Sequence, residues 1–222
     1  MILTQAHIPY DIAARAWKAN GFRDSYAWHQ RIWEAFPNQP KANRNFLTRL
    51  DDTGQDFRLL ILSPDPPTRP DWCPSTQWES KAMDANFFHH PAYHFSLVAN
   101  PTVKLVIHDE HGQRKKNGKR VPLIHREDKV IDGRTIPGLE TWMQRKAAQH
   151  GFAIHPDHPL RIDPRPEQTF IKQGTVGKHQ ATEFSGVLTV SDQALFEQAV
   201  TQGIGSAKAF GFGLLCLSPI NL

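Results

Sequence analysis

Cysteine is scarce in this chain, and long apolar runs are missing. Only Cys73 and Cys216 occur among the 222 residues, so no disulfide framework is expected. No apolar run reaches the roughly 18 residues that a membrane-spanning helix needs. The first residues lead directly into a predicted strand, without the charged segment and cleavage site of a signal peptide. We therefore expect a protein of the reducing cytoplasm that makes no contact with a membrane.

Several catalytic signatures are also missing. The nucleophile elbow Gly-x-Ser-x-Gly does not occur, which disfavours one large class of hydrolases. Three loosely spaced histidine pairs are present, but neither Cys-x-x-Cys nor His-Glu-x-x-His accompanies them. These pairs are His89-His90, His108-His111 and His155-His158. We expect no metal and no cofactor. A metal-dependent hydrolase that uses these histidine pairs is the alternative.

Glycine, in contrast, is concentrated near the C-terminal end. Gly203-Ile204-Gly205 and Gly211-Phe212-Gly213 enclose a segment that contains Lys208. Glycine permits positive φ and close backbone approach, and the lysine suggests an anion. A helix over 191–202, capped by Ser191, is predicted before the loop and a strand over 214–219 after it. Nucleotide-binding loops need the opposite order, strand then helix, so this loop is not predicted to hold a nucleotide cofactor.

Positive charge is concentrated in one short segment. The net charge is +4 and the pI about 9.1, but residues 112–120 hold five cations and no acid. A solvated turn is the simplest explanation; a cationic hairpin tip that faces phosphates is the functional one. Further cations nearby favour nucleic acid as the partner. They are Lys104, Arg126, Lys129, Arg134, Arg145 and Lys146.

The pattern of apolar residues predicts an α+β protein in two halves. In the first half it indicates strands over 1–9, 45–50 and 56–63 and helices over 26–36 and 77–85. The five prolines of 64–74 make that segment irregular. In the second half it indicates strands over 93–100, 104–108, 120–124, 152–155, 169–172 and 182–190 and a helix over 137–149. Antiparallel hairpins mixed with helices favour two tandem α+β sandwiches, residues 1–90 and 91–222, over one doubly wound sheet.

The helix predicted over 26–36 carries the strongest catalytic candidates. At 100° per residue, Trp28, Ile32 and Phe36 share a buried stripe, and Asp24 or Ser25 can cap the helix. His29 and Tyr26 lie one turn apart at the edge of this stripe. An imidazole can transfer a proton near neutral pH, and a tyrosine hydroxyl can position a phosphate. An ordinary histidine at the border of the core is the alternative.

Five blocks of sequence in order resemble a known family. They are residues 26–38 with Tyr-x-x-His, residues 97–104, residues 118–123, residues 184–190 and the glycine loop 203–213. The glycine loop resembles that of the repeat-associated RNA-binding superfamily of CRISPR systems. The whole set resembles the CRISPR RNA-processing endoribonucleases of the Escherichia coli-type Cascade complex (type I-E).

This resemblance implies both a fold and an activity. The fold would be two tandem ferredoxin-like domains, similar to RNA-recognition motifs, each an antiparallel sheet with helices on one face. The activity would be metal-independent cleavage of precursor CRISPR RNA at the 3′ base of the repeat stem-loop, giving 2′,3′-cyclic phosphate and 5′-hydroxyl ends. The protein, a monomer when free, would stay on the CRISPR repeat RNA and join the Cascade subunits. The glycine loop would shape the RNA surface and pack on the N-terminal domain.

The resemblance also suggests roles for individual residues. His29 would be the general acid or base and Tyr26 its partner. Some relatives have a lysine five residues after the histidine; Glu34 stands there in this chain, so a further cation would have to come from Arg31, Lys172 or Lys178. The predicted RNA-binding residues are Arg23, Arg31, Lys104, Arg114, Lys115, Lys116, Lys119, Arg120, Lys172, Lys178, Gly203, Gly205, Ser206 and Lys208. The alternative function is a non-catalytic RNA-binding scaffold subunit of the same superfamily.

Overall fold

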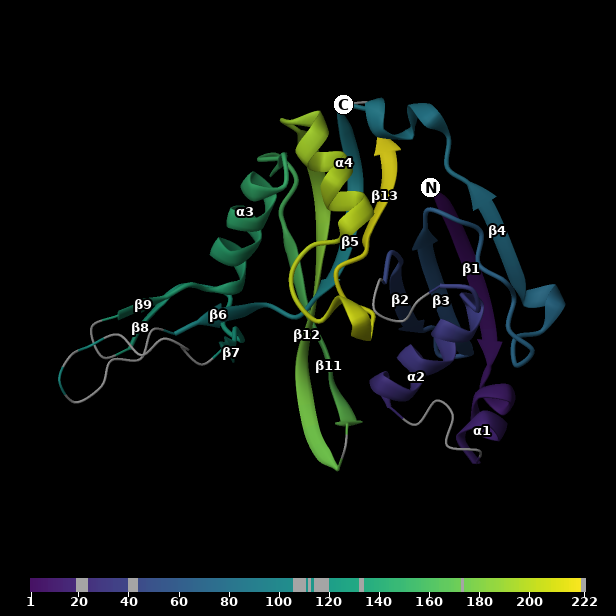
Figure 1. The fold of residues 1–222 in the computed structure, drawn as a ribbon. Coiled ribbons are helices and arrows are strands. Elements are labelled where there is room, and N and C mark those ends of the chain that lie inside the picture. Colours follow the sequence, from purple (N-terminus) through teal and green to yellow (C-terminus); the bar gives the residue numbers. More distant parts are fainter. Residues whose placement is uncertain are drawn as a thin grey trace.

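The computed structural model describes residues 1–18, 24–39, 44–105, 111, 113, 120–131, 134–172 and 174–220. Within these ranges the chain forms two large antiparallel sheets that lie side by side (Figure 1). We call them the N-terminal sheet and the C-terminal sheet. None of the helices in the described ranges has the length and apolar character needed to cross a membrane.

The N-terminal sheet has the strand order β2-β3-β1-β4, which is the order of a ferredoxin-like fold. Its strands are β1 (Ile2–Pro9), β2 (Leu47–Asp52), β3 (Asp56–Ser63) and β4 (Trp78–Ala82). The connection from β1 to β2 contains α1 (Tyr10–Lys18), α2 (Ser25–Ile32) and the 3₁₀ turn η1 (Trp33–Ala35). The proline-rich connection from β3 to β4 contains only the 3₁₀ turn η2 (Ser75–Gln77) as regular structure.

The C-terminal sheet repeats this arrangement as β10-β12-β5-β13, with β11 added beside β12. Its elements are β5 (Ala92–Ala99), α3 (Leu139–Gln149), β10 (Phe152–Ile154), β11 (Arg161–Lys172), β12 (Thr175–Val190), α4 (Gln193–Gln202) and β13 (Leu215–Ile220). The 3₁₀ turns η3 (Ala85–His89) and η4 (Lys208–Phe210) precede β5 and β13. Two small hairpins extend from the sheet: β6 (Thr102–Lys104) with β7 (Arg120–Pro122), and β8 (Lys129–Ile131) with β9 (Arg134–Ile136). The chain is thus an α+β protein with two ferredoxin-like folds in tandem, and we propose that they divide near residue 90.

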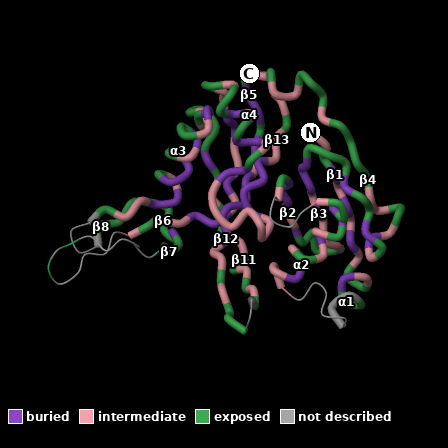
Figure 2. The backbone as a smooth tube through the Cα atoms, in the orientation of Figure 1, coloured by how far each residue is buried: buried purple, intermediate pink, exposed green. Residues whose placement is uncertain are grey.

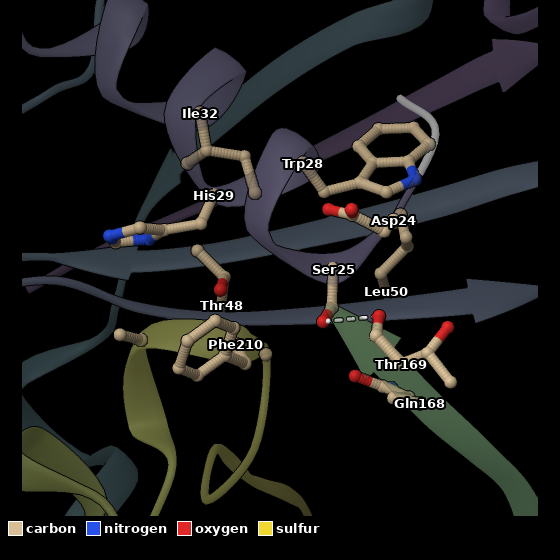
Figure 3. A pocket seen from close by; sticks show the side chains of 12 residues that line it. Asp24, Ser25, Trp28, His29, Ile32, Thr48, Leu50, Gln168, Thr169 and Phe210 are labelled. Carbon is tan, nitrogen blue, oxygen red and sulfur yellow. Dashed lines mark hydrogen bonds between the residues drawn. The ribbon is translucent and has the colours of Figure 1, made fainter. Parts of the chain in front are cut away.

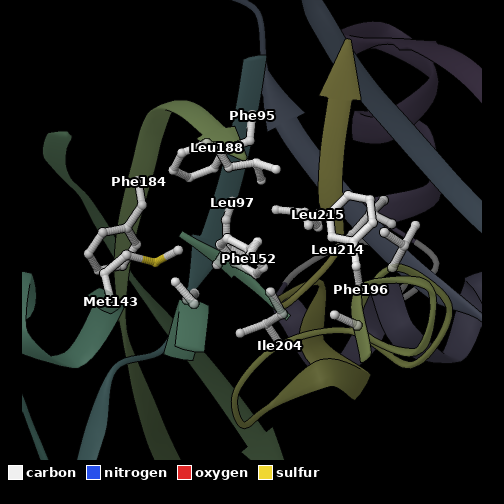
Figure 4. Close-up of a cluster of buried hydrophobic side chains, with 14 of the residues drawn as sticks. Phe95, Leu97, Met143, Phe152, Phe184, Leu188, Phe196, Ile204, Leu214 and Leu215 are labelled. Atoms are coloured by element: carbon white, nitrogen blue, oxygen red, sulfur yellow. The ribbon is translucent and has the colours of Figure 1, made fainter. Parts of the chain in front are cut away.

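Each sheet is covered by helices on one face. In the N-terminal sheet, Ile8 of β1 and Ile61 of β3 pack with Trp28 and Ile32 of α2. In the C-terminal sheet, α3 and α4 contribute Met143 and Phe196 among others to a large core, which includes Phe184 and Leu97 from the strands (Figure 4). The predicted stripe on the helix of residues 26–36 is therefore confirmed, because its apolar face is the face that meets the sheet.

The predicted elements are largely present, with three corrections. The helix expected over 77–85 is wrong, because these residues contain the edge strand β4, which pairs with β1 from Ala6–Trp78 to Ile2–Ala82. The predicted cap at Ser191 is wrong by one residue, since Asp192 Oδ1 accepts from the backbone N–H of Leu195 at 3.0 Å. The strands expected over 169–172 and 182–190 are the ends of a much longer hairpin, β11–β12.

The long β11–β12 hairpin extends beyond the C-terminal sheet, and its tip is exposed (Figure 2). The β11 strand contains Pro164 and Pro166 and changes register between Arg165 and Gln168. Proline cannot donate to a ladder hydrogen bond, so it is tolerated at an edge strand with a bulge. The short predicted strand misses this extension because local propensity disfavours proline in strands. Contacts between α2 and β11 show that the hairpin reaches the N-terminal half.

Arg49 joins the two sheets through a buried ionic contact. Its side chain lies on the face of β2 opposite α2 and is 5% exposed. Arg49 Nε donates to Asp51 on the same strand at 2.9 Å, and Nη2 donates to Glu183 of β12 at 2.9 Å. Nη1 donates to Ser96 of β5 at 2.6 Å. One guanidinium is therefore bonded to carboxylates from both sheets.

Each of the two carboxylates bonded to Arg49 also accepts from a second arginine. Arg58 of β3 donates to Asp51 at 2.9 Å, and Arg165 of β11 donates to Glu183 at 2.8 Å. Burial alone would raise the pKa of Glu183, but hydrogen bonds from Ser96, Arg49 and Arg165 outweigh it and hold the pKa at about 2. Removing one member of such a buried charge cluster should lower the free energy of unfolding of the protein by about 3–5 kcal/mol.

Replacing Glu183 should change how stability depends on pH. Since the folded pKa of Glu183 lies below its unfolded value, its contribution is present above about pH 4.5 and is lost as pH falls towards 2. Wild-type protein should lose roughly 3 kcal/mol more than Glu183→Gln between pH 5 and pH 2. Urea unfolding across this range measures the difference.

Glu79→Gln, at an exposed position of β4, serves as the matched control and should follow the wild-type curve. Parallel curves for wild type and Glu183→Gln would contradict the assigned role of the Glu183 carboxylate.

Candidate functional site

A cavity of about 270 Å³ lies where the two halves of the chain meet. Its wall combines α2, the strands β2 and β11, and the loop of residues 203–213 (Figure 3). The residues that Figure 3 labels are Asp24, Ser25, Trp28, His29, Ile32, Thr48, Leu50, Gln168, Thr169 and Phe210. Because these come from both sheets, the cavity exists only when the sheets are docked.

His29 lies at the wall of this cavity and is half-buried. It is placed there by α2, whose first turn is capped by Asp24, with Oδ1 accepting from Ala27 N–H at 2.8 Å. One turn later, the indole of Trp33 donates from Nε1 to His29 Nε2 at 3.1 Å. An indole nitrogen can only donate, so Nε2 accepts and the proton of a neutral ring lies on Nδ1. The Phe210 ring lies 6.2 Å from the imidazole, centroid to centroid.

Two hydrogen bonds tie the start of α2 to β11. Ser25 Oγ donates to the carbonyl of Thr169 at 3.2 Å, the contact drawn in Figure 3. The backbone N–H of Ile171 donates to Asp24 Oδ2 at 3.2 Å. Asp24 therefore caps the helix with one oxygen and contacts β11 with the other. These bonds fix the position of the catalytic candidate relative to the C-terminal half.

The glycine loop depends on backbone conformations that other residues rarely adopt. Gly203 ends α4 at φ 76°, and Gly205, Gly211 and Gly213 have φ between 87° and 88°. The two arms of the loop close on each other, because Ile204 N–H donates to the carbonyl of Gly213 at 2.9 Å. A Cβ at Gly213 would lie 2.6 Å from the Ile204 carbonyl oxygen. Glycine is needed here for both its φ and the space.

This loop packs on the N-terminal sheet, which confirms one expectation from the sequence. A Cβ at Gly203 would lie 2.8 Å from the Leu47 side chain of β2. Arg44 reaches across from the other side, donating from Nη1 to the carbonyls of Phe46 at 2.7 Å and Lys208 at 3.0 Å. The loop thus places Phe210 beside His29 through contacts with β2 and the segment before it.

Lys208 serves the loop itself. Its Nζ donates to the carbonyls of Gln202 at 2.8 Å and Gly203 at 3.3 Å, the last carbonyls of α4. Burial, together with the positive charge of Arg44, lowers the pKa of Lys208. The carbonyls at the negative end of α4 therefore supply part of the negative charge that the sequence led us to expect beside Lys208. An additional contact with RNA remains a prediction.

The other predicted residues are distributed over several places. Tyr26 is half-buried one turn before His29 but is not among the described residues that line the cavity. Arg31 forms an ion pair with Glu34 at 2.8 Å on the far side of the same turn. Lys104 is exposed at the end of β6, opposite Arg120 of β7. A Cβ added at Gly205 would lie 3.6 Å from the Trp142 ring of α3.

Some predicted residues fall outside the described ranges. They are Arg23, Arg114, Lys115, Lys116 and Lys119, and for Lys172 the side chain. The pairing of Lys104 with Arg120 shows that two paired strands flank the basic segment. The first of them, β6, overlaps the strand expected over 104–108 only at Lys104, and residues 106–108 lie outside the described ranges.

Sequence reasoning missed several residues of the cavity. Gln168 and Thr169 come from the part of β11 that was not expected to reach the site, and the Gln168 Oε1 atom is buried without a hydrogen-bond partner among the described residues. Phe210 could have been predicted from the sequence, since it is the aromatic residue between the two glycine pairs of the loop. Trp33 could also have been predicted, because residues four apart on a helix are neighbours, and Trp33 follows His29 by four. Among the described residues, no three His, Cys, Asp or Glu side chains gather closely enough to hold a metal ion.

Fold and site together define a protein with tandem ferredoxin-like domains and a histidine-bearing cavity between them. The chain belongs to the CRISPR associated protein family, whose model matches residues 2–219. The CRISPR system Cascade subunit CasE of Escherichia coli (strain K12) is 34% identical over 213 residues, which cover 94% of this chain and 97% of that protein. This finding confirms the resemblance that the sequence blocks indicated.

A further relative and a solved structure agree with this assignment. The CRISPR-associated endoribonuclease Cse3 of Thermus thermophilus is 24% identical over 226 residues, which cover 95% of this chain and 96% of that protein. The crystal structure of the CRISPR-associated protein Cas6e from Escherichia coli str. K-12 gives a TM-score of 0.67 at 27% identity. It covers 99% of this chain and 100% of that chain.

Replacing Gly213 should destabilise the protein more than replacing a glycine that has free space around its Cα. Gly54 has φ 83° with nothing within 4 Å of an added Cβ, so Gly54→Ala should cost only the roughly 1–2 kcal/mol of the left-handed backbone. Gly213→Ala adds a collision with the Ile204 carbonyl and should cost clearly more. Urea unfolding of the two variants measures this, and equal losses would show that the loop does not need its close approach.

Proposed function

We propose that this protein is a metal-independent endoribonuclease. It cleaves precursor CRISPR RNA at the 3′ base of the repeat stem-loop and leaves 2′,3′-cyclic phosphate and 5′-hydroxyl ends. It then stays on the mature RNA as a subunit of a Cascade complex in the cytoplasm. The observation that carries this proposal is the position of His29, at the wall of a cavity that both sheets build.

The chemistry needs a nucleophile, a proton acceptor and a proton donor. RNA supplies the nucleophile, since the 2′-oxygen forms a bond to phosphorus while the bond from phosphorus to the 5′-oxygen breaks. The proton of the 2′-hydroxyl leaves to a base, and the 5′-oxygen takes up a proton from an acid. An imidazole performs either transfer near neutral pH. We assign one of these transfers to His29, with Tyr26 as its partner on the same helix.

Trp33 acts on this reaction by positioning His29. Its indole holds one ring nitrogen at 3.1 Å, and the Phe210 ring limits the imidazole from the side of the glycine loop. A proton-transfer group held in one orientation loses less entropy on reaching the reacting geometry. Trp33 therefore contributes to the reaction without touching the substrate.

RNA binding is assigned to the basic hairpin and the glycine loop. Residues 112–120, between β6 and β7, contain five cations, and the two flanking strands share a cavity wall with the loop residue Ser206. Clustered cations suit the phosphates of an RNA stem, whose bases are hidden in a deep, narrow groove. The names of the relatives support an RNA-processing role: one is called an endoribonuclease and another a Cascade subunit. We expect the free protein to be a monomer.

Replacing His29 should abolish cleavage and leave binding largely intact. Loss of a general acid or base lowers the rate by about 10²–10⁴-fold. The measurement is single-turnover cleavage of the repeat hairpin RNA in EDTA, with binding followed on the same RNA. His29→Ala should bind like wild type without cutting.

His158→Ala, an exposed histidine in a turn after β10, is the matched control and should cut like wild type. Cutting by His29→Ala at the wild-type rate would refute the site. If wild type bound the hairpin but never cut it, the non-catalytic scaffold would be the correct function.

Neutralising the basic hairpin should weaken the salt dependence of binding. Each lost phosphate contact reduces the slope of log affinity against log salt by about one. The triple variant Lys115→Gln, Lys116→Gln, Lys119→Gln should therefore show a slope flatter by up to about three. Lys81→Gln, at an exposed position of β4, should keep the wild-type slope. An unchanged slope in the triple variant would exclude phosphate contacts by these lysines.

A further inference from the structure

The cavity beside His29 has no lysine or arginine among the described residues that line it. Its carboxylate, Asp24, accepts from the backbone N–H groups of Ala27 and Ile171 with its two oxygens. A phosphate inside the cavity would face this carboxylate without a lysine or arginine to offset the repulsion. The occupant that suits this cavity is therefore an uncharged part of the RNA.

Thr48 presents an unused hydroxyl to the same cavity. It is an almost fully buried residue of β2, 3% exposed, and it lines the cavity. Its hydroxyl is open to the cavity and has no hydrogen-bond partner among the described residues. In Figure 3 the hydroxyl points towards the ring of Phe210. A valine would have the same shape without the cost of an unpaired hydroxyl, so a threonine here suggests an absent partner.

Another wall of the cavity is aromatic. Phe210 lines it from the glycine loop, which Gly211 brings against β2. A Cβ added at Gly211 would lie 4.0 Å from the Thr48 carbonyl oxygen. The part of RNA that combines a flat apolar face with a hydrogen-bonding edge is the base. A base in this cavity would meet the Phe210 ring with its face and the Thr48 hydroxyl with its edge.

The size of the cavity suits a base better than a whole nucleotide. Its volume of about 270 Å³ lies just below the roughly 300 Å³ at which pockets for small organic ligands begin. Ile32 and Leu50 add apolar side chains to the lining, which favours a flat ring over a ribose with its hydroxyls. Since His29 is only half-buried, the backbone of the RNA can stay at the mouth while one base enters.

We propose that this cavity binds the base of the first nucleotide after the cut, with Phe210 stacking on the base and the Thr48 hydroxyl bonded to its edge. The proposal rests on the proposed function, in which the RNA is cut at the 3′ base of the stem-loop. The nucleotide after the cut then lies outside the stem, so its base enters the cavity without breaking a pair. This nucleotide carries the 5′-oxygen that leaves, and its bound base would hold that oxygen next to His29.

The test measures the binding of an RNA that cannot be cut. The RNA is the repeat hairpin from the CRISPR array of the genome that encodes this chain, with a 2′-deoxynucleotide on the 5′ side of the cut. The base after the cut is either present or removed. Wild type should bind the abasic RNA about tenfold more weakly than the RNA with the base.

Two variants assign this loss to the cavity. Thr48→Val keeps the shape of the side chain and removes the hydroxyl. It should bind the RNA with the base about threefold more weakly than wild type does, and the abasic RNA equally well. Phe210→Leu removes the stacking face and should also reduce the loss that the abasic site causes.

Matched controls separate a contact with RNA from an effect on folding. Thr48→Ser retains a hydroxyl and should bind both RNAs like wild type. Thr68→Val, at an exposed position of the proline-rich connection, should do the same. Because the Thr48 hydroxyl bonds to no described residue, Thr48→Val should unfold at the same urea concentration as wild type or at a higher one.

The results that contradict the proposal differ from those that contradict the nuclease. If wild type cuts the unmodified hairpin but binds both blocked RNAs equally, the cavity does not hold this base and the nuclease stands. The same conclusion follows if Thr48→Val weakens the binding of both RNAs by the same factor, or if it unfolds at a clearly lower urea concentration. If wild type neither binds nor cuts the hairpin, both proposals fail.

Discussion

The ionic contact of Arg49 is the interaction on which the rest of the structure depends. A guanidinium that is almost fully buried must satisfy its donors, and it does so with Asp51 on its own strand and with Ser96 and Glu183 on the other sheet. Removing one of the charged partners would leave an uncompensated buried charge, so the docked arrangement of the sheets requires the whole set. The relative placement of the two ferredoxin-like folds follows from this bonding.

The proposed active site is a consequence of that placement. His29 belongs to a helix of the first fold, and Phe210 and Thr169 belong to the second. Neither fold carries the cavity alone, and the hydrogen bonds from Asp24 and Ser25 to β11 hold its two sides together. The glycine loop packs on the first sheet and brings the Phe210 ring beside His29.

Local periodicity predicted an α+β protein and the helix that carries His29, while the tandem ferredoxin-like folds and the packing of the glycine loop on the first half were implied by the resemblance to the family. Sequence reasoning could not find the contact of Arg49 with Glu183, since charged residues on a strand look like a solvated face until a second sheet covers them. The strand β4 was mistaken for a helix because pairing with β1 overrides its local preference. The reach of β11, and with it Gln168, was hidden by two prolines that an edge strand tolerates.

The central claim is that RNA supplies the nucleophile and this protein supplies the proton transfer. The most direct measurement is single-turnover cleavage, in EDTA, of a repeat hairpin with a single 2′-deoxynucleotide on the 5′ side of the cut. The account predicts that this RNA binds as tightly as the unmodified hairpin and is not cut, while the unmodified RNA yields a 2′,3′-cyclic phosphate. Cleavage of the deoxy-substituted RNA at the normal rate would contradict it.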